Sequence, residues 1–417
     1  MFLFGTQRKN IPIPHFLYNP TMAKEIEFSV MMPADAQAQF LQKVVADFRL
    51  KHRTNISLVP LNWAEGREKL LQIALYRHGA DLSDVGSTWV SDFIGMNGLR
   101  PFSPREQALL GGEGAFIPSV WKVGRPLNVE GLWAIPWGVS PTVIVYRKDK
   151  LAQAGVDEKT AFSSFGQMEN TLQRLKEKGS YFQLPLEAGS YTSLHMAASW
   201  LWGHGGDLVS PDGKRAIFDS AEAQKAVVAY FNLRRFFAPD WRQAPEAPYP
   251  QDFRQGKTAI CLGGSWAAAP RADVLPEVSA NLRVAPLPGS AFVGSQHFVV
   301  WNHTRQPEAA IELVRYLTSK EALSELVRTV YLLPARLDLL EGELYQKNEI
   351  YKALASAAVS GRTFPTMSLF GLLEQKLSGM LEQIWRQLRQ DPDQDVESLV
   401  REIVTGLVRR LNATLGS

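Results

Sequence analysis

The order of strand-like and helix-like segments near the start of the chain most limits the fold. Residues 25–32 and 55–61 have the pattern of strands, and residues 37–53 between them carry apolar side chains at helical spacing. A second helix is expected over residues 65–78, and a short strand over residues 82–86. This βαβαβ order predicts a parallel sheet with helices on both faces, and therefore an α/β fold.

The two expected helices should each turn an apolar stripe toward the sheet. The expected core-facing side chains are Phe40, Val44, Val45 and Phe48 in the first helix, and Leu70, Leu71, Ala74 and Leu75 in the second.

Later segments predict a second part of the fold. Residues 132–147 have the pattern of two strand halves, and the prolines at 136–141 predict a break where the chain crosses between two lobes. A long helical and loop region is expected over residues 157–238. Further strands are expected at residues 258–262, 282–285 and 298–301, and helices at 307–318 and 396–411.

Several of the eleven tryptophans stand beside glycine and small polar residues rather than within apolar runs. The clearest motifs are Gly86-Ser87-Thr88-Trp89, Pro136-Trp137-Gly138, Trp200-Leu201-Trp202-Gly203 and Gly264-Ser265-Trp266. Glycine permits sharp turns and close approach of the backbone, so such rings suit a cleft that binds ligands with flat apolar faces, such as sugars. The alternative is that these tryptophans fill the core, as large aromatic side chains often do.

Composition and motifs exclude several classes of function. The net charge is only +3 and no run of Lys or Arg stands out, so nucleic acid is not an expected partner. A single cysteine, Cys261, leaves no intrachain disulfide and no cysteine-based metal cage. Neither a Gly-x-Ser-x-Gly nor a His-Glu-x-x-His motif occurs, so we expect no enzyme, no cofactor and no metal. A pair of cleft carboxylates, as in a glycoside hydrolase, would leave no such signature.

The first 22 residues are expected to be an extension that precedes the folded unit. They contain three prolines and no apolar segment typical of a secretory signal peptide. No stretch of the chain approaches the ~18 apolar residues of a membrane span.

The motifs, taken in order, resemble those of family 1 extracellular solute-binding proteins, the maltose-binding-protein-like group that feeds ABC importers. The resemblance runs from about Ile26 to Leu411. It rests on Asp84–Phe93, on Gly131–Leu151, on Phe253–Trp266, on Gly294–Phe298 and on Leu333–Arg336. These segments resemble, respectively, the family's Asp-Val strand with its ligand-facing loop, its first crossing, its Gly-Lys strand with a Gly-Ser-Trp loop, its second crossing and its Pro-x-Arg element.

This resemblance implies a two-lobed type II periplasmic-binding-protein fold with a hinged interlobe cleft. The lobes would comprise residues 23–139 with 296–335, and residues 140–295 with 336–417. The implied function is non-catalytic binding of a carbohydrate-like solute for delivery to the permease of an ABC importer. A periplasmic or extracytoplasmic location and a monomeric state are implied too.

The resemblance also implies particular ligand contacts. Trp89, Tyr191 and Trp266 would stack on the solute, and Thr88, Ser140, Gln296 and Arg336 would hydrogen-bond its polar edges. Asp35 follows the first strand, and Gly294 and Ser295 lie at the second crossing. His195, His297 and Phe364 are further candidates. Ser140 departs from the family pattern, because many sugar binders carry a carboxylate there.

Some of these residues also have ordinary structural explanations. Asp35 could cap a helix, Tyr191 could belong to the core, and Arg336 could pair with a surface carboxylate. Two other functions remain open, a sensory binding protein acting on a receptor or kinase, and a carbohydrate-active enzyme. The solute could be an oligosaccharide or a glycerol phosphodiester, and Arg336 beside the ligand would favour the second.

Overall fold

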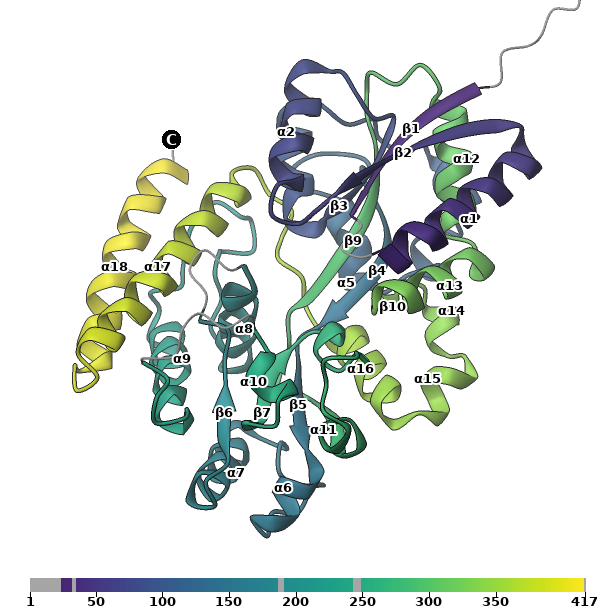
Figure 1. The fold of residues 1–417 in the computed structure, drawn as a ribbon. Coiled ribbons are helices and arrows are strands. Elements are labelled where there is room, and N and C mark those ends of the chain that lie inside the picture. Colours follow the sequence, from purple (N-terminus) through teal and green to yellow (C-terminus); the bar gives the residue numbers. More distant parts are fainter. Residues whose placement is uncertain (1–23, 32–34, 187–190, 243–248, 416–417) are drawn as a thin grey trace, which may run out of the picture.

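The structure, a computed structural model, describes residues 24–31, 35–186, 191–242 and 249–415. Within these residues the larger strands form two sheets, each covered by helices, and the chain passes between the sheets near the centre of the molecule (Figure 1). The six-stranded sheet has the order β10-β4-β9-β3-β1-β2, and the four-stranded sheet has the order β6-β7-β5-β8.

The first sheet is parallel only over the strands that the start of the chain predicts. β1 (Lys24–Met31) pairs in parallel with β2 (Thr54–Leu61) and with β3 (Leu82–Gly86). β9 (Val293–Val300) runs antiparallel to β3 and to β4 (Ile135–Pro141). The parallel sheet expected from the start of the chain is therefore confirmed for β1–β3. The antiparallel strands β4 and β9 come from later in the chain and carry it to and from the second lobe.

The helices that follow the first two strands are α1 (Asp35–His52) and α2 (Gly66–Tyr76). Val44, Phe48, Leu70 and Ala74 are buried as expected, but the side chain of Leu75 is 64% exposed. Leu75 follows Ala74 by one residue, about 100° round the helix, so it leaves the apolar stripe that Leu70 and Ala74 share. The side chain of Phe40 lies outside the described part of the chain.

The second sheet combines β5 (Val143–Arg147), β6 (Tyr181–Gln183), β7 (Thr258–Gly263) and β8 (Leu282–Pro286). Successive side chains of its strands point to opposite faces of the sheet. In β5, Ile144 and Tyr146 join the apolar core that contains most of the helical region and the C-terminal helices. Val143 and Val145 point to the opposite face and join the core that continues from the first sheet.

The predicted break at residues 136–141 is wrong. These residues form β4, with a register shift between Pro136 and Gly138 that accommodates a proline inside a paired strand. The chain instead leaves the first sheet at Thr142, returns between β8 and β9, and leaves again after β10 (Leu333–Pro334). We propose the lobe division of residues 23–139 with 296–335 and 140–295 with 336–417, noting that β4 and β9 stay in the first sheet as far as Pro141 and Val293.

The remaining helices lie in the two lobes around the sheets. They are α3 (Val90–Gly95), α4 (Pro104–Leu109), α5 (Pro118–Trp121), α6 (Lys148–Gln153), α7 (Phe165–Glu177), α8 (Tyr191–Gly203), α9 (Ala221–Asn232), α10 (Gln251–Arg254), α11 (Pro276–Asn281), α12 (Pro307–Leu317), α13 (Lys320–Val330), α14 (Leu337–Leu340), α15 (Glu343–Lys347), α16 (Glu349–Ser360), α17 (Phe370–Gln390) and α18 (Val396–Leu415). Among the described residues, no helix is both long and apolar enough to cross a membrane.

Candidate functional site

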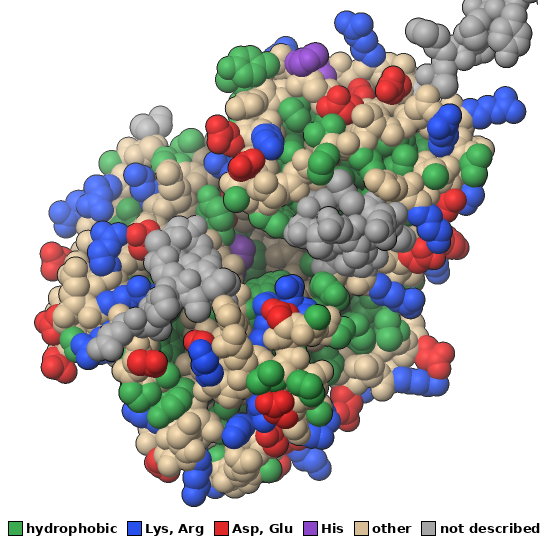
Figure 2. Space-filling model, viewed as in Figure 1, with side chains coloured by type: hydrophobic (Ala, Val, Ile, Leu, Met, Phe, Trp, Pro, Cys, Tyr) green, Lys and Arg blue, Asp and Glu red, His purple; other side chains and the backbone are tan. Residues whose placement is uncertain are grey.

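A cavity of about 420 Å³ lies where the two lobes meet, and the surface there is hollowed (Figure 2). This volume falls in the range of roughly 300–1,000 Å³ typical of small-molecule sites. The first lobe contributes the end of β1, the short helix η1 (Ser87–Trp89) and parts of β4 and β9. The second lobe contributes the start of α8 and the loop into the short helix η5 (Ser265–Ala267).

Most of the residues predicted to contact a ligand lie together in the wall of this cavity. They are Thr88, Trp89, Ser140, Tyr191, Trp266, Gly294, Ser295 and Gln296, with the further candidate His195. The wall also includes Met31, Trp63, Thr142, Thr192, Met196, Phe292 and Leu332. No Asp, Glu, Lys or Arg occurs among the described residues that line it.

Aromatic rings stand on both sides of the cavity. Trp89 is 5% exposed, and its ring centroid lies 5.4 Å from that of Trp63 with an interplanar angle of 57°. On the second lobe, Trp266 meets Tyr249 edge to face, with centroids 6.2 Å apart. Tyr191 keeps 40% of its surface exposed at the start of α8. The tilted rings form a corner against which the apolar face of a flat ligand can pack.

Sequence reasoning missed Trp63, although a usable signal existed. Trp63 follows β2 by two residues, and its side chain is 43% exposed in the cavity wall. Ligands in open α/β folds sit at the carboxyl ends of strands, and β2 is parallel to β3, whose end leads to Trp89. The same rule that predicted Trp89 therefore applies to Trp63.

Other tryptophans of the glycine motifs are core residues. Trp137, Trp200 and Trp202 are 2%, 1% and 6% exposed. Trp137 Nε1 donates a hydrogen bond of 2.8 Å to Asp84 Oδ1. For these three rings, filling the core is the correct interpretation.

Asp84 is a buried carboxyl that joins three strands of the first sheet, and one of these strands ends at the cavity with Met31. It lies in β3 with no exposed surface, accepts from Trp137 in β4, and accepts from the backbone N–H of Met31 in β1 at 3.4 Å. Burial raises the pKa of Asp84 to about 7, and the hydrogen bonds from Trp137 and Met31 partly oppose that rise. Since Met31 itself lines the cavity, Asp84 fixes part of the binding surface from behind.

A hydrogen-bond network crosses the cavity's edge at Ser140. Ser265 donates its backbone N–H to Ser140 Oγ at 3.0 Å, and the two hydroxyls lie 3.1 Å apart. Ser265 Oγ also lies 2.7 Å from the carbonyl oxygen of Tyr331, at the end of α13 in the first lobe. The network therefore ties η5 of the second lobe to β4 of the first sheet and to the end of α13 in the first lobe.

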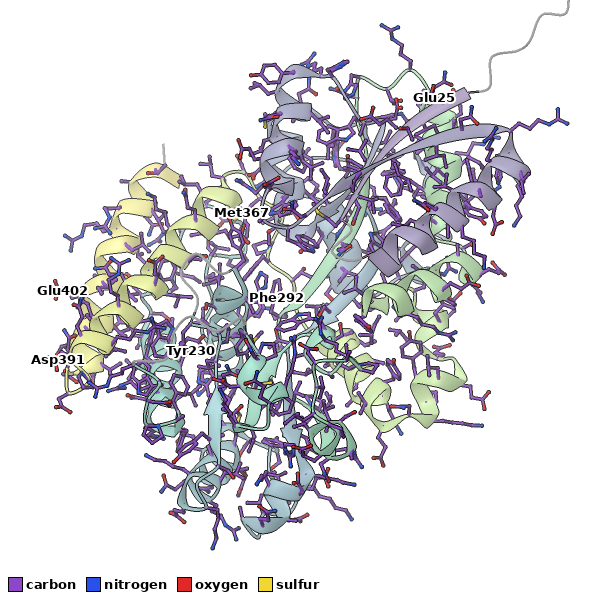
Figure 3. The ribbon with its side chains drawn as sticks, in the orientation of Figure 1. Glu25, Tyr230, Phe292, Met367, Asp391 and Glu402 are labelled. Atoms are coloured by element: carbon purple, nitrogen blue, oxygen red, sulfur yellow. The ribbon has the colours of Figure 1, made fainter. Side chains whose placement is uncertain are left out.

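Two buried polar atoms in the wall have no hydrogen-bond partner among the described residues, Ser295 Oγ and His195 Nε2. His195 stacks on Phe292 with centroids 4.1 Å apart, and Phe292 lies at the centre of the molecule (Figure 3). Burial lowers the pKa of His195 to about 3, so its ring is neutral. A buried polar atom without a partner costs about 1–3 kcal/mol, which a ligand hydroxyl could recover.

The remaining predicted residues lie elsewhere. Arg336 is not among the residues that line the cavity. It donates two hydrogen bonds of 3.1 and 2.8 Å to Asp338, and its guanidinium lies over the Phe116 ring. His297 is fully buried in β9, with Nε2 3.1 Å from the carbonyl oxygen of Val120. Phe364 packs against Phe292, with ring centroids 4.6 Å apart. The side chain of Asp35 lies outside the described residues.

A metal centre finds no support in the part of the chain that the structure describes. No group of three or more His, Cys, Asp or Glu is placed there to hold an ion. Cys261 is buried in β7, and burial raises the pKa of its thiol. The site thus offers rings, hydroxyls, amides and a neutral imidazole.

These features define a class of protein, the two-lobed binding proteins that hold a small solute where the lobes meet. A family model described as bacterial extracellular solute-binding protein matches residues 34–323, more than half of the chain. The protein belongs to this family.

Individual relatives agree with the family assignment. The chain is 23% identical to the diacetylchitobiose binding protein DasA of Streptomyces coelicolor over 358 residues, covering 82% of this chain and 79% of the relative. The sugar-binding protein MalE from Xanthomonas citri has a similar fold, with a TM-score of 0.79 at 21% identity, covering 94% and 98% of the two chains. A Thermotoga lettingae solute-binding protein, solved with alpha-D-tagatose, has a TM-score of 0.78 at 18% identity, covering 94% and 100%.

Proposed function

We propose that this protein binds a neutral carbohydrate between its lobes and releases it chemically unchanged to the permease of an ABC importer. The observation that carries this proposal is the wall of the cavity, which combines rings from both lobes with uncharged polar groups. A sugar presents apolar C–H faces to rings and hydroxyl edges to hydrogen-bond partners, so it matches both components.

The same wall argues against an anionic solute. A glycerol phosphodiester would need a cation or several N–H donors for its phosphate. Arg336, the candidate for that role, is paired with Asp338 outside the cavity, and the described wall contains no Lys or Arg. We therefore propose an oligosaccharide or a smaller neutral sugar rather than a phosphodiester.

Two further parts of the proposal follow from the site and the family. Hydrolysis of a glycosidic bond generally requires two carboxyl groups roughly 5–10 Å apart, and the described wall supplies none, which supports binding without catalysis. Membership of an extracellular solute-binding family supports an extracytoplasmic location and the importer's permease as partner. We also propose that the protein acts as a monomer.

A thermal-shift screen followed by isothermal titration tests this function. The panel comprises maltose, maltotetraose, diacetylchitobiose, glucose, tagatose and glycerophosphocholine. A neutral sugar at 100 times its Kd should stabilise the protein by about 2.7 kcal/mol. Recovery of that sugar unchanged supports a binding protein, whereas its turnover, or a shift with glycerophosphocholine alone, would overturn the proposal.

A further inference from the structure

A buried carboxyl lies where a C-terminal helix of the second lobe meets the first lobe. Glu374, in α17, is 1% exposed, and its Oε1 has no hydrogen-bond partner among the described residues. Its neighbours Phe370, Leu373 and Leu377 belong to the core of the second lobe. Met367, just before α17, lies where the two lobes approach each other (Figure 3).

The surface opposite this carboxyl belongs to the first lobe. α17 contacts η1 and α3, which follow β3. There Arg67 Nη2 and Asp92 Oδ2 form an ion pair of 2.5 Å. The backbone of α17 approaches this pair so closely that a Cβ on Gly371 would stand 2.6 Å from Asp92 Oδ2 and 2.9 Å from Arg67 Nη2. Relative movement of the lobes must therefore change the surroundings of Glu374.

We propose that Glu374 is a proton-linked clasp between the lobes, so that closure of the cleft takes up one proton. The carboxyl enters the interface in its neutral form, because burial of a carboxylate that keeps one unsatisfied oxygen is costly. This inference rests on the proposed binding between the lobes and on closure of the lobes about a hinge, but not on the identity of the solute.

The groups around Glu374 agree with a neutral carboxyl in the closed form. Burial raises the pKa of Glu374 to about 7, while the Thr88 hydroxyl and Arg67 act to lower it and Asp92 to raise it. Tyr191 in α8 is affected by the same groups, since burial first and then the charge of Glu374 raise its pKa. The opposite charges of Arg67 and Asp92 largely cancel in their effect on the pKa of Glu374, so burial is the main cause of its rise.

The sign of the effect follows from linkage. Exposure of Glu374 in an open form returns its pKa toward the ordinary value of about 4.3. The closed form then binds the proton more tightly, so acidification favours closure between these two pKa values. From pH 7.5 to pH 5.5, the ratio of closed to open molecules should rise on the order of tenfold.

Electron–electron distance measurements on the full chain test this without any solute. Spin labels go on Leu50→Cys in α1 and Arg409→Cys in α18, both at exposed positions, while the native Cys261 is fully buried. In the labelled protein with Glu374 unchanged, the fraction of molecules at the shorter distance between the labels should be larger at pH 5.5 than at pH 7.5. Glu374→Gln, which keeps the shape but cannot titrate, should show equal distributions at both pH values.

Two further variants make the result specific. Glu382→Gln changes a carboxyl of the same helix that pairs with Arg386 on the surface, and it should keep the pH response. Gly371→Ala should lower the closed population at both pH values, because its Cβ meets Asp92 and Arg67. A pH response that is absent in the unmodified interface, or that persists in Glu374→Gln, would overturn the clasp. Since no sugar is present, failure of the sugar proposal would not affect this readout.

Discussion

Gly264→Ala is the most informative single perturbation of the site, because one added carbon meets both the stacking ring and the interlobe network. The backbone of Gly264 is extended, with φ −86°, so alanine fits its conformation and only the space is at issue. Its Cβ would overlap Ser140 Oγ and would stand 2.5 Å from Trp266 Nε1. Ser140 can escape only by rotating away from Ser265, and the indole must shift as a rigid body.

The expected magnitude combines these two effects. Overpacking of this kind costs about 1–3 kcal/mol, and the loss of one hydrogen bond about 1 kcal/mol. Together these costs are about 2–4 kcal/mol, and because the entropy of unfolding grows with chain length, a chain of this size should lose only about 2–5 °C in Tm. Affinity for the sugar should fall further, by about ten- to a hundredfold, since the displaced groups form the cavity wall itself.

Isothermal titration and thermal unfolding measure the two effects separately. Gly379→Ala provides the matched control, since its Cβ meets nothing within 4 Å and it lies in the middle of α17. That variant should keep the affinity and gain about 0.5–1 kcal/mol of stability from the better helix propensity of alanine. Unchanged sugar affinity in Gly264→Ala would refute the placement of Trp266 and Ser140 in the binding wall.

The remaining predictions concern Trp63, Arg336 and Asp84. Trp63→Ala should weaken sugar binding at least about tenfold in titration while hardly changing Tm, because its ring is half exposed in the cavity wall; unaltered affinity would exclude it from the site. Arg336→Ala should leave affinity unchanged but lower Tm through the loss of its pair with Asp338, and a loss of affinity would contradict its placement. Asp84 has a folded-state pKa of about 7, above its unfolded value, so its stabilising contribution is complete below pH 4 and is lost as the pH rises through 7. Chemical denaturation should therefore show a smaller loss of stability between pH 5 and pH 8 in Asp84→Asn than in the natural protein, and an equal loss would contradict the assignment.

Much of the first lobe could be predicted because its pattern is local. A strand of eight residues or a helix of several turns contains enough repeats of its apolar pattern for the element to be recognised from sequence, as in β1 and α1. Leu75 shows the limit of such reading, since the pattern does not define the edge of an apolar stripe. β6, with only three residues, is too short for any period and was missed within the region expected to be helix and loop.

The site was predicted in part for a similar reason. Trp89 and Trp266 each follow a strand and a glycine, so local sequence predicts their place near strand ends. Arg336 was misplaced because its partner depends on side-chain direction, although Asp338 lies only two residues away. Glu374 gave no local signal, because its burial results from the meeting of α17 with elements almost 300 residues earlier in the chain.

Titration of the purified protein with the sugar that gives the largest thermal shift decides whether a neutral sugar binds between the lobes. A Trp266→Ala variant and a chemical analysis of the recovered sugar accompany the titration. We expect saturable binding at one site, a loss of at least about tenfold in affinity in the variant, and unchanged sugar. Binding that survives in Trp266→Ala, or a sugar recovered as cleaved products, would contradict it.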